Sequence, residues 1–299
     1  MSAPARSLRT ARGVVELGGA PLLMGIVNAT PDSFSDGGVR RTLEQQVAIA
    51  RSMVESGAQI VDVGGESGVT NRPAVAPAEE IELVVPLIGR IVDEVEALVS
   101  VDTYKPAVAR AAIEAGASIV NDVSGLRDVS LADVCAETGA ALVLMHTRAA
   151  PKVKRLDPEL DGRVVEDVIE FLRSRIAIAV DHGVAFEQLL LDPGPDFAKT
   201  PAQTVEALRG LDLIHELGRP LMLAVSRKDF VGAITGRGPR ERLAGTLAAI
   251  GYGVDAGAHV LRVHDVADVA DFLAVRAVLQ GGDEIDRDLR LPDELRWAQ

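Results

Sequence analysis

Eight short apolar runs in the sequence are each followed at once by polar or charged residues. The side chains are of types that grip anions, carry protons or hold metals. They stand at Asn28, Asp62, Asp102, Asn121, His146, Asp192, Ser226, Lys228, Arg262 and His264. Any one has a structural explanation, such as a helix cap at Asp102 or Ser226 or a core position at His146. Eight such ends together favour one functional site.

One subset of these residues is suited to a flat heterocycle. Asp102, Asn121, Asp192 and Lys228 combine hydrogen-bond acceptors with donors. A carboxylate can accept paired N–H groups from a ring that carries amino and oxo groups. The subset therefore predicts a pocket for a heteroaromatic ring.

A second subset is suited to phosphate. Asn28 follows the first apolar run, and Arg262 and His264 belong to the last one. In a closed barrel the first and last strands are neighbours. Arginine offers forked donors to phosphate, and Mg²⁺ takes oxygen ligands while it keeps waters. The alternative is an ion pair of Arg262 and His264 with Asp265, which leaves Asn28 unexplained.

A repeated unit positions these residues. Gly57, Gly116, Gly139 and Gly257 each follow a helical stretch and precede an apolar run, as expected of glycines that end helices. Short apolar runs of this kind are typical of parallel strands buried on both faces. We expect strands at 22–27, 60–63, 99–101, 118–121, 141–145, 188–192, 221–225 and 260–263.

Helices are expected between these strands, at 42–56, 78–95, 105–115, 130–138, 161–182, 200–217, 239–256 and 266–280. Eight strand–helix units in about 260 residues predict the α/β class and a single (β/α)8 TIM barrel. A doubly wound sheet would more often show Gly-x-Gly-x-x-Gly after the first strand, and this turn is absent. We expect an N-terminal tail and hairpin at 1–21, with the hairpin at 12–19 closing the barrel bottom. The barrel spans 22–280, and a charged tail spans 281–299.

Composition and charge exclude several classes of protein. The 299 residues are 47% hydrophobic with a formal net charge of −13, which excludes a disordered chain and argues against binding to nucleic acid or an anionic membrane. No apolar run has the length of a membrane span, and the N-terminus lacks the apolar stretch of a secretory signal. The single cysteine, Cys135, cannot form an intramolecular disulfide. We therefore expect a cytoplasmic protein in which Cys135 is a buried packing residue.

The residues around Asn28 resemble the first signature of the dihydropteroate synthase family, Met24-Gly-Ile-Val-Asn-Ala-Thr-Pro-Asp-Ser-Phe-Ser-Asp-Gly-Gly38. The remaining blocks of the family are resembled, in order, by Asp62-Val-Gly-Gly-Glu-Ser67, Ser100-Val-Asp-Thr103, Asn121-Asp-Val-Ser-Gly125, Leu191-Asp-Pro-Gly194, Ser226-Arg-Lys228 and Arg262-Val-His-Asp265. The first signature is specific, whereas Asp-Pro-Gly alone is not. The similarity runs from Leu22 to Gln280.

The resemblance implies a transferase of folate biosynthesis. It would condense 6-hydroxymethyl-7,8-dihydropterin diphosphate with 4-aminobenzoate, giving 7,8-dihydropteroate and diphosphate, with Mg²⁺ as cofactor. The pterin contacts implied are Asp102, Asn121, Met145, Asp192, Phe197 and Lys228. The diphosphate contacts implied are Asn28, Arg262 and His264, with Asn28 at the metal. The aminobenzoate-side loops implied contain Thr30, Pro31, Phe34, Ser67, Thr70, Arg72, Pro73 and Ser226.

The implied chemistry assigns catalytic roles to Asp102, Lys228, Arg262 and His264. Cleavage of a carbon–oxygen bond leaves a CH₂ cation conjugated with the pterin, so no covalent enzyme nucleophile is required. Mg²⁺, Arg262 and a protonated His264 would stabilise the departing diphosphate, and Asp102 or Asp192 the cation. Residues 32–38 read either as a lid that excludes water or as a simple surface turn.

Two departures from the family pattern concern the aminobenzoate side. The loop at 68–74 is longer than the family's and separates Thr70 from Arg72, which predicts an altered response to sulfonamides that compete for this pocket. Asp229 follows Lys228 where a neutral or basic residue is common. It is either a favourable first-turn acid or a like charge facing the benzoate. Two alternatives therefore stay open, a pterin-binding paralogue with a lost or changed amine acceptor and a non-catalytic pterin-binding module.

Assembly and charge distribution give two further expectations. The helices at 239–256 and 266–280 are rich in Ala, Leu and Val, which fits the homodimer usual in the family, although helix-on-barrel packing explains the same composition. Both implied substrates are anions. Because Lys199, Arg227, Lys228 and Arg262 stand at strand ends, we predict a positive focus at one barrel mouth on an otherwise negative surface.

Overall fold

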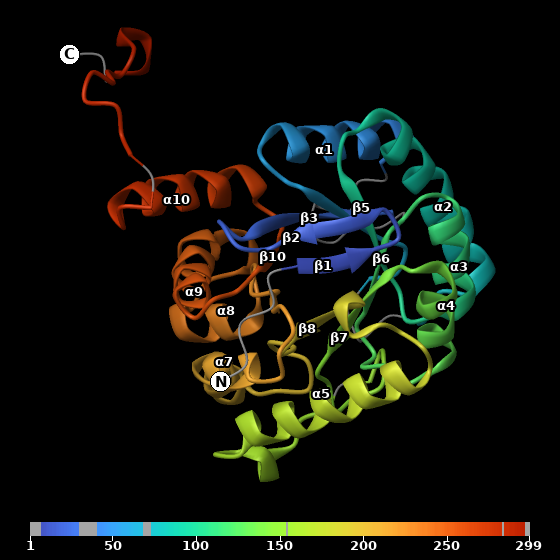
Figure 1. Cartoon of the computed structure of the whole chain (residues 1–299). Helices are drawn as coiled ribbons and strands as arrows, with labels where there is room; N and C mark the ends of the chain where they lie inside the picture. Colours follow the sequence, from blue (N-terminus) through green and yellow to red (C-terminus); the bar gives the residue numbers. More distant parts are fainter. Residues whose placement is uncertain (1–6, 30–40, 68–72, 154, 283, 297–299) are drawn as a thin grey trace.

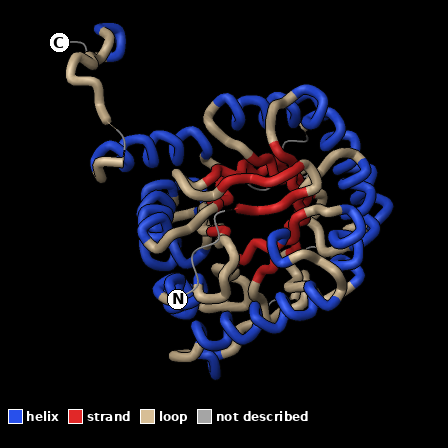
Figure 2. Tube along the Cα trace, viewed as in Figure 1, coloured by secondary structure: helices blue, strands red, loops and turns tan. Residues whose placement is uncertain are grey.

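The computed structural model describes residues 7–29, 41–67, 73–153, 155–282 and 284–296. Within them, eight parallel strands form one sheet that curls into a nearly closed barrel ringed by helices (Figures 1 and 2). The strand order is β8-β7-β6-β5-β4-β3-β10-β9. A single bridge between Leu191 and Leu221 links the two ends of this order. The predicted (β/α)8 barrel is confirmed.

The barrel strands lie close to their expected positions. They are β3 (Leu22–Asn28), β4 (Ile60–Gly64), β5 (Leu98–Asp102), β6 (Ile119–Asp122), β7 (Ala141–Met145), β8 (Leu189–Asp192), β9 (Met222–Leu223) and β10 (Val260–Val263). The seventh of them, β9, is shorter than predicted, and the sheet is joined least completely there.

The helices differ from expectation in two places. They are α1 (Leu43–Glu55), α2 (Pro77–Glu94), α3 (Pro106–Glu114), α4 (Ser130–Thr138), α5 (Val164–Asp181), α6 (Pro201–Arg209), α7 (Leu211–His215), α8 (Asp229–Thr235), α9 (Leu243–Asp255) and α10 (Val266–Leu279). The helix expected at 200–217 is divided at Gly210, a poor helix former that packs against Val165. The short α8 was not predicted, and Gly236 ends it in the left-handed conformation.

A hairpin of β1 (Ser7–Thr10) and β2 (Gly13–Glu16) covers the N-terminal end of the barrel (Figure 1). It begins five residues before the expected span of 12–19. Leu8 and Leu17 are buried with Met24 and Ile60 in an apolar cluster inside this end. The cluster closes the barrel bottom, so the opposite end is left for polar groups.

Side chains that point into the barrel change from apolar to polar along the strands. On β4, Ile60 belongs to the apolar cluster, whereas Asp62 forms an ion pair. On β10, Val260 belongs to the same cluster, whereas Arg262 is the partner of Asp62. Alternate residues of a strand face the same side. The inward position nearer the carboxyl end of each of these strands is therefore the one that carries charge.

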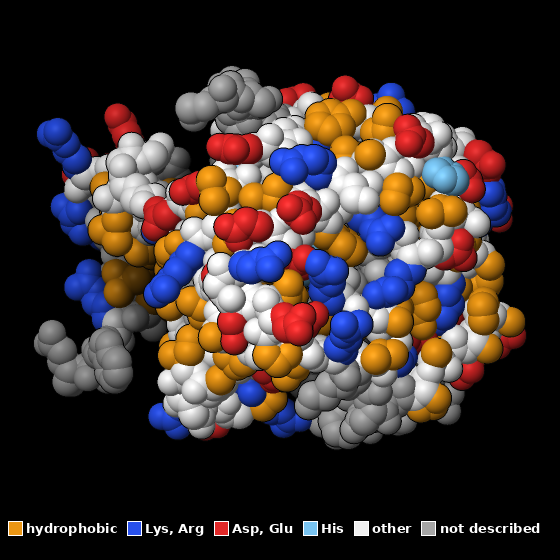
Figure 3. Space-filling view, turned by 90° about the horizontal axis from the view of Figure 1, so that it is seen from below, with side chains coloured by type: hydrophobic (Ala, Val, Ile, Leu, Met, Phe, Trp, Pro, Cys, Tyr) orange, Lys and Arg blue, Asp and Glu red, His pale blue; other side chains and the backbone are white. Residues whose placement is uncertain are grey.

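The outer surface and the tail have no part in this polar end. In the part of the chain that the structure describes, none of the helices is long and apolar enough to cross a membrane. Residues 284–296 run away from the barrel beyond α10 and are exposed (Figure 1). On the face seen in Figure 3, basic and acidic side chains are interspersed. That face is mixed in charge rather than uniformly negative.

Candidate active site

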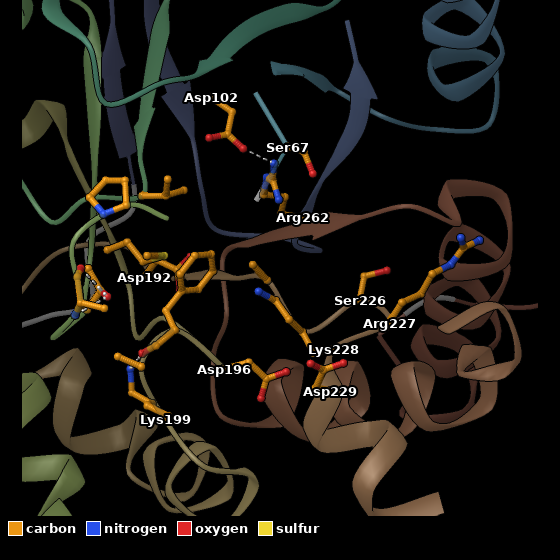
Figure 4. A pocket seen from close by; sticks show the side chains of 18 of the residues that line it. Ser67, Asp102, Asp192, Asp196, Lys199, Ser226, Arg227, Lys228, Asp229 and Arg262 are labelled. Carbon is orange, nitrogen blue, oxygen red and sulfur yellow. Dashed lines mark hydrogen bonds and ion pairs between the residues drawn. The ribbon is translucent and has the colours of Figure 1, made fainter. Parts of the chain in front are cut away.

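A cavity of 1190 Å³ opens at the carboxyl ends of the barrel strands (Figure 4). Most of the described residues predicted for the site line it, namely Asn28, Ser67, Asp102, Asn121, Met145, Asp192, Phe197, Ser226, Lys228, Arg262 and His264. Pro73 is described but is not among the lining residues. The remaining predictions, Thr30, Pro31, Phe34, Thr70, Arg72 and the lid at 32–38, lie outside the described residues.

The cavity wall is balanced in charge, which corrects the expectation of a positive focus. Its basic residues are Lys152, Arg155, Lys199, Arg227, Lys228, Arg240 and Arg262. Its acidic residues are Glu66, Glu80, Asp102, Asp192, Asp196, Asp229 and Glu241. Among the described residues the seven cations are matched by seven acids, so this part of the wall is neutral in sum. The whole chain has a formal net charge of −13. A neutral cavity wall therefore repels an anionic substrate less than a negatively charged wall would.

Arg262 is held between two carboxylates at the centre of the cavity. Its Nε donates to Asp62 Oδ2 at 2.7 Å and its Nη2 to Asp102 Oδ2 at 2.6 Å (Figure 4). Burial lowers the pKa of Arg262, but the two carboxylates raise it by more, so the guanidinium stays charged. Burial raises the pKa of Asp102, and Arg262 opposes this. The alternative pairing of Arg262 with Asp265 is wrong, since Asp265 pairs with Arg227.

Two buried oxygen atoms lie beside Arg262, and one of them belongs to Asn121, which lines the cavity. Asp62 is 0% exposed and Asn121 is 1% exposed. Asn121 Nδ2 donates to Asp62 Oδ2 at 3.2 Å. Within the described residues, Asp62 Oδ1 and Asn121 Oδ1 have no hydrogen-bond partner. Buried acceptors of this kind are costly unless an N–H or O–H group reaches them. A heterocycle with ring N–H and amino groups supplies such donors.

The opposite wall carries Asp192, Phe197 and Lys228. Asp192 Oδ1 accepts the Gly194 N–H at 2.7 Å, and the Lys228 Nζ lies 4.2 Å from the centre of the Phe197 ring. Burial raises the pKa of Asp192 and lowers the pKa of Lys228. Burial thus disfavours the charged forms of Asp192 and Lys228, and a ligand that binds these charged forms would offset that cost. The aromatic ring and the two charges together suit a flat polar ligand.

Ser226 and His264 form a hydrogen-bonded pair at the ends of the last two barrel strands. Ser226 Oγ lies 3.0 Å from His264 Nδ1 and accepts the His264 backbone N–H at 3.2 Å. Burial first, and then Arg262 and Arg227, lower the pKa of His264 to about 4. The imidazole is therefore neutral in the site without an anion, and a protonated His264 beside the departing diphosphate stays a prediction. A neutral imidazole there can still donate or accept one hydrogen bond.

Asp229 is the first residue of α8 and forms an ion pair with Arg242 at 2.8 Å. Its side chain is 87% exposed. It therefore occupies the first-turn position where the helix dipole favours an acid. The structure supports this alternative rather than a like charge aimed at a bound benzoate. The Arg227 side chain points away from Lys228 in Figure 4, and its Nε donates to Asp265 Oδ2 at 2.9 Å.

Comparison with known proteins agrees with this geometry. A family model described as pterin binding enzyme matches residues 24–264. Dihydropteroate synthase of Bacillus subtilis is 41% identical over 250 residues, which are 83% of this chain and 85% of that protein. The chain belongs to the dihydropteroate synthase family. It is thus a member of a transferase enzyme family.

Solved structures of dihydropteroate synthases have the same fold. The structure of the Xanthomonas albilineans enzyme with 4-aminobenzoic acid is 42% identical, with a TM-score of 0.83, and the match covers 92% of this chain and 98% of that one. The structure of the same enzyme with 7,8-dihydropteroate is 42% identical, with a TM-score of 0.81, and covers 91% and 98%. The resemblance inferred from the motifs is confirmed.

The donor set fits a metal held chiefly by substrate. In the described segments, no group of three His, Cys, Asp or Glu side chains is arranged to hold a metal ion. Asn28 lines the cavity as an oxygen donor. Mg²⁺ often uses one or two protein oxygens together with substrate phosphates and waters. A Mg²⁺ ion that is held by Asn28 and by the oxygens of a bound diphosphate would therefore fit this site.

A wall of buried ion pairs was not anticipated from the sequence. Lys105 Nζ contacts Glu66 Oε2 at 2.6 Å and also pairs with Glu80. Glu66 accepts the Tyr104 hydroxyl at 3.0 Å and the Val75 N–H at 2.9 Å. Charges from two successive strand–helix units, β4–α2 and β5–α3, meet here, and local spacing does not reveal such a meeting. Asp62 was counted among the polar strand ends but was given no contact of its own, and its pairing with Arg262 was not predicted.

Proposed function

We propose that this protein condenses 6-hydroxymethyl-7,8-dihydropterin diphosphate with 4-aminobenzoate to form 7,8-dihydropteroate and diphosphate in folate biosynthesis. The carrying observation is the convergence of Arg262, Asp62 and Asn121, with two free buried acceptors, at the mouth of the barrel. The family membership and the relative that binds 7,8-dihydropteroate support the assignment.

The pterin ring is held by the buried polar groups of the cavity. Asn121 Oδ1 accepts one of its N–H groups, and the carboxylates of Asp102 and Asp192 accept others. Lys228 donates to a ring acceptor while Phe197 and Met145 contact the ring face. Filling the unsatisfied Asn121 acceptor gives binding energy and rejects rings that lack the donor.

Bond cleavage is assisted by charge on both sides of the reacting carbon. The carbon–oxygen bond breaks, and its electron pair leaves with the diphosphate. Arg262 has more N–H groups than its two carboxylates use, and these face the leaving group together with His264. Asp102 stabilises the positive charge that develops on the pterin. Mg²⁺ bound by Asn28 and diphosphate would neutralise the developing negative charge.

The new carbon–nitrogen bond forms when the arylamine attacks the CH₂ cation. The amine then loses one proton to solvent or to the departing diphosphate. Ser67 and Ser226 line the side of the cavity left for the benzoate. Asp229 does not oppose this anion, because its charge is exposed and paired with Arg242.

The test is release of diphosphate by the purified protein with both substrates and Mg²⁺. We expect release only when 4-aminobenzoate is present, and expect a 4-aminobenzoate-like sulfonamide to compete with it. Arg262→Ala should lower kcat by about 100-fold or more while the protein stays folded. Failure to release diphosphate at saturating substrates would refute the synthase assignment. The remaining alternatives would then be a pterin-binding paralogue with a lost or changed amine acceptor and a non-catalytic pterin-binding module.

We also propose a cytoplasmic homodimer joined through α9 and α10. Tyr252 on α9 and Val275 and Leu279 on α10 are 48%, 61% and 80% exposed. Large apolar side chains exposed on adjacent helices are typical of an interface. Light scattering after gel filtration should give twice the chain mass, and Leu279→Glu should lower it to one chain. A single-chain mass for the unaltered protein contradicts the proposal.

A further inference from the structure

A buried chain of side chains runs from the cavity wall to the surface and has no role in the chemistry above. Lys199 Nζ lies 2.7 Å from His146 Nδ1, and His146 Nε2 lies 2.9 Å from Asp167 Oδ2. Asp167 also accepts Arg148 Nε at 2.8 Å, and Arg148 is half-exposed. Lys199, His146 and Asp167 are 4%, 1% and 7% exposed. Burying three titratable groups destabilises the folded state unless hydrogen bonds compensate for the lost hydration. A row of such groups therefore calls for a functional explanation.

The same lysine is hydrogen-bonded inside the loop that connects β8 with α6. Its Nζ donates to Gly194 O at 2.9 Å and lies 3.4 Å from Phe197 O. In Figure 4, Lys199 lies on the far side of Asp196 from Lys228. The ammonium therefore does not reach toward the cavity centre as Lys228 does. It ties two carbonyl groups of its own loop to the end of β7.

This loop has a backbone that needs support. Asp196 and Ala198 have φ values of +64° and +54°, which lie in the left-handed region and are unfavourable for residues other than glycine. Such conformations persist only where the surroundings over-determine them. Gly194 also has a positive φ, and a Cβ added there would clash with the His146 carbonyl oxygen. The loop is thus pressed against the end of β7, where Lys199 meets His146.

The supported loop carries two of the groups that face the proposed ligand. Asp192 begins it, and its carboxylate is oriented by the N–H of Gly194. Phe197 packs beneath the Lys228 ammonium. A shift of this loop moves both groups without removing either. Displacements of about 1 Å at groups that touch a substrate are enough to weaken binding and catalysis strongly.

We propose that Lys199, backed by His146 and Asp167, is a positioning residue that holds Asp192 and Phe197 against the pterin ring. Its three N–H groups are shared among four acceptors, namely His146 Nδ1, Gly194 O, Phe197 O and, at 3.5 Å, His146 O. His146 then donates from Nε2 to Asp167, which fixes the imidazole as one neutral tautomer. This inference rests on pterin as the ligand, but not on the transfer reaction.

The charge state of this lysine offers a readout that a purely structural residue lacks. Burial lowers the pKa of Lys199 to about 7, Asp192 and Asp196 oppose this, and Lys228 adds to it. Burial, Lys199 and Arg148 lower the pKa of His146 to about 2, so the imidazole stays neutral. Above neutral pH the ammonium loses a proton, and with it one of its three hydrogen bonds. Pterin affinity should then fall.

The experiment is calorimetric titration of the full chain with 6-hydroxymethylpterin, which carries no diphosphate and cannot react. Lys199→Met keeps the length of the side chain and removes its donors. We expect its dissociation constant to rise about tenfold, because buried carbonyls lose their partner. The alkaline fall in affinity should also disappear in this variant. Arg209→Met, on the exposed face of α6, is the control and should bind as the unaltered protein does.

A second variant keeps the inference testable if Lys199→Met does not fold by circular dichroism. Asp167→Asn preserves an acceptor of the same size for His146, and we expect a dissociation constant raised about threefold. Unchanged pterin affinity with an unchanged pH profile in a folded variant overturns the inference, as does failure of the unaltered protein to bind the probe. Lys199-dependent pterin binding without diphosphate release would refute the proposed reaction and leave this inference standing.

Discussion

Arg262 and Asp62 lie 200 positions apart in the sequence, yet Arg262 Nε donates to Asp62 Oδ2 at 2.7 Å. They come from β10 and β4, which are separated in the sheet only by β3. Asp62 is fully buried, and Arg262 is 17% exposed. The carboxylate therefore lies beneath the guanidinium and limits where it can point. Asp62 therefore balances the charge of Arg262 and also fixes the direction of its guanidinium.

Asp62→Asn tests this dual role. The amide keeps one acceptor but loses the charge that balances Arg262. We expect kcat/KM for the pterin substrate to fall about 100-fold and the free energy of unfolding to fall by about 3 kcal/mol. Steady-state kinetics and urea unfolding measure these two changes. Asp133→Asn, at a surface carboxylate paired with His182, is the matched control and should change neither quantity. A kcat/KM within twofold of the unaltered protein would contradict the role of Asp62.

The elements that hold this pair could be predicted because their signals are local. A glycine, a short apolar run and a terminal polar residue recur in the sequence, and each repeat became a strand with its polar residue at the carboxyl end. The partner of Arg262 could not be predicted in this way. Asp265 is the acid nearest to Arg262 in the sequence, three residues away. In the folded barrel, however, Asp62 lies beside the Arg262 guanidinium and Asp265 pairs with Arg227. Contacts between distant strands depend on closure of the sheet rather than on spacing.

Protonation states and short helices were equally hidden from the sequence. His264 stands among charged residues in the sequence, but its neutrality follows from burial, from the neighbouring Arg262 and from Arg227, which folding brings near it. The helix α8 has only seven residues and follows Lys228 directly, so it is too short to show a helical period. The side chains that line the cavity were thus predicted by type and place, and their electrostatic states required the fold.

His264 predicts a pH dependence of stability. Its pKa is about 4 in the folded protein against an ordinary value of 6.5. Between these two pH values the unfolded chain binds more protons, so the free energy of unfolding falls as the pH is lowered through this window. His264→Gln removes this contribution, so its stability should fall by less over the same range. Urea unfolding at several pH values measures the difference, to which His146 contributes equally in both proteins. Parallel stability curves would contradict a buried neutral His264.

The same histidine predicts proton uptake on binding of diphosphate. An anion beside the imidazole favours the charged form and raises its pKa. Inorganic diphosphate with Mg²⁺ should therefore bind with net proton uptake at a pH between 4 and 6.5. Calorimetry in buffers of different ionisation enthalpy measures the number of protons taken up. His264→Gln should abolish most of the uptake, and equal uptake in both proteins would place the diphosphate away from His264.

We expect Asp229→Asn to have a small effect on the binding of 4-aminobenzoate, because the Asp229 carboxylate is exposed. The side chain is 87% exposed and faces Arg242. We expect the KM for 4-aminobenzoate to change by about twofold or less, as is usual for an exposed charge. Steady-state kinetics with varied 4-aminobenzoate provides the measurement. A KM that falls tenfold in the variant would indicate that Asp229 repels the benzoate in the working enzyme.

Replacing Lys105 should lower the free energy of unfolding strongly, and a second substitution should restore part of the loss. Its ammonium lies between Glu66 and Glu80, and all three side chains are at most 11% exposed. Lys105→Met leaves two buried carboxylates without their cation, so the free energy of unfolding should fall by about 3–5 kcal/mol. Arg110→Met removes an exposed pair with Glu137 and should cost less than about 0.5 kcal/mol.

The double variant Lys105→Met with Glu80→Met replaces one buried ion pair by apolar contacts. It should recover part of the lost stability, because an unpaired buried charge costs more than an apolar neighbour. Glu66 still accepts the N–H of Val75, and Lys152 still pairs with it. Urea unfolding of the unaltered protein, Lys105→Met, Glu80→Met and the double variant measures the coupling. A double variant no more stable than Lys105→Met would show that the unpaired Glu80 is not the source of the loss.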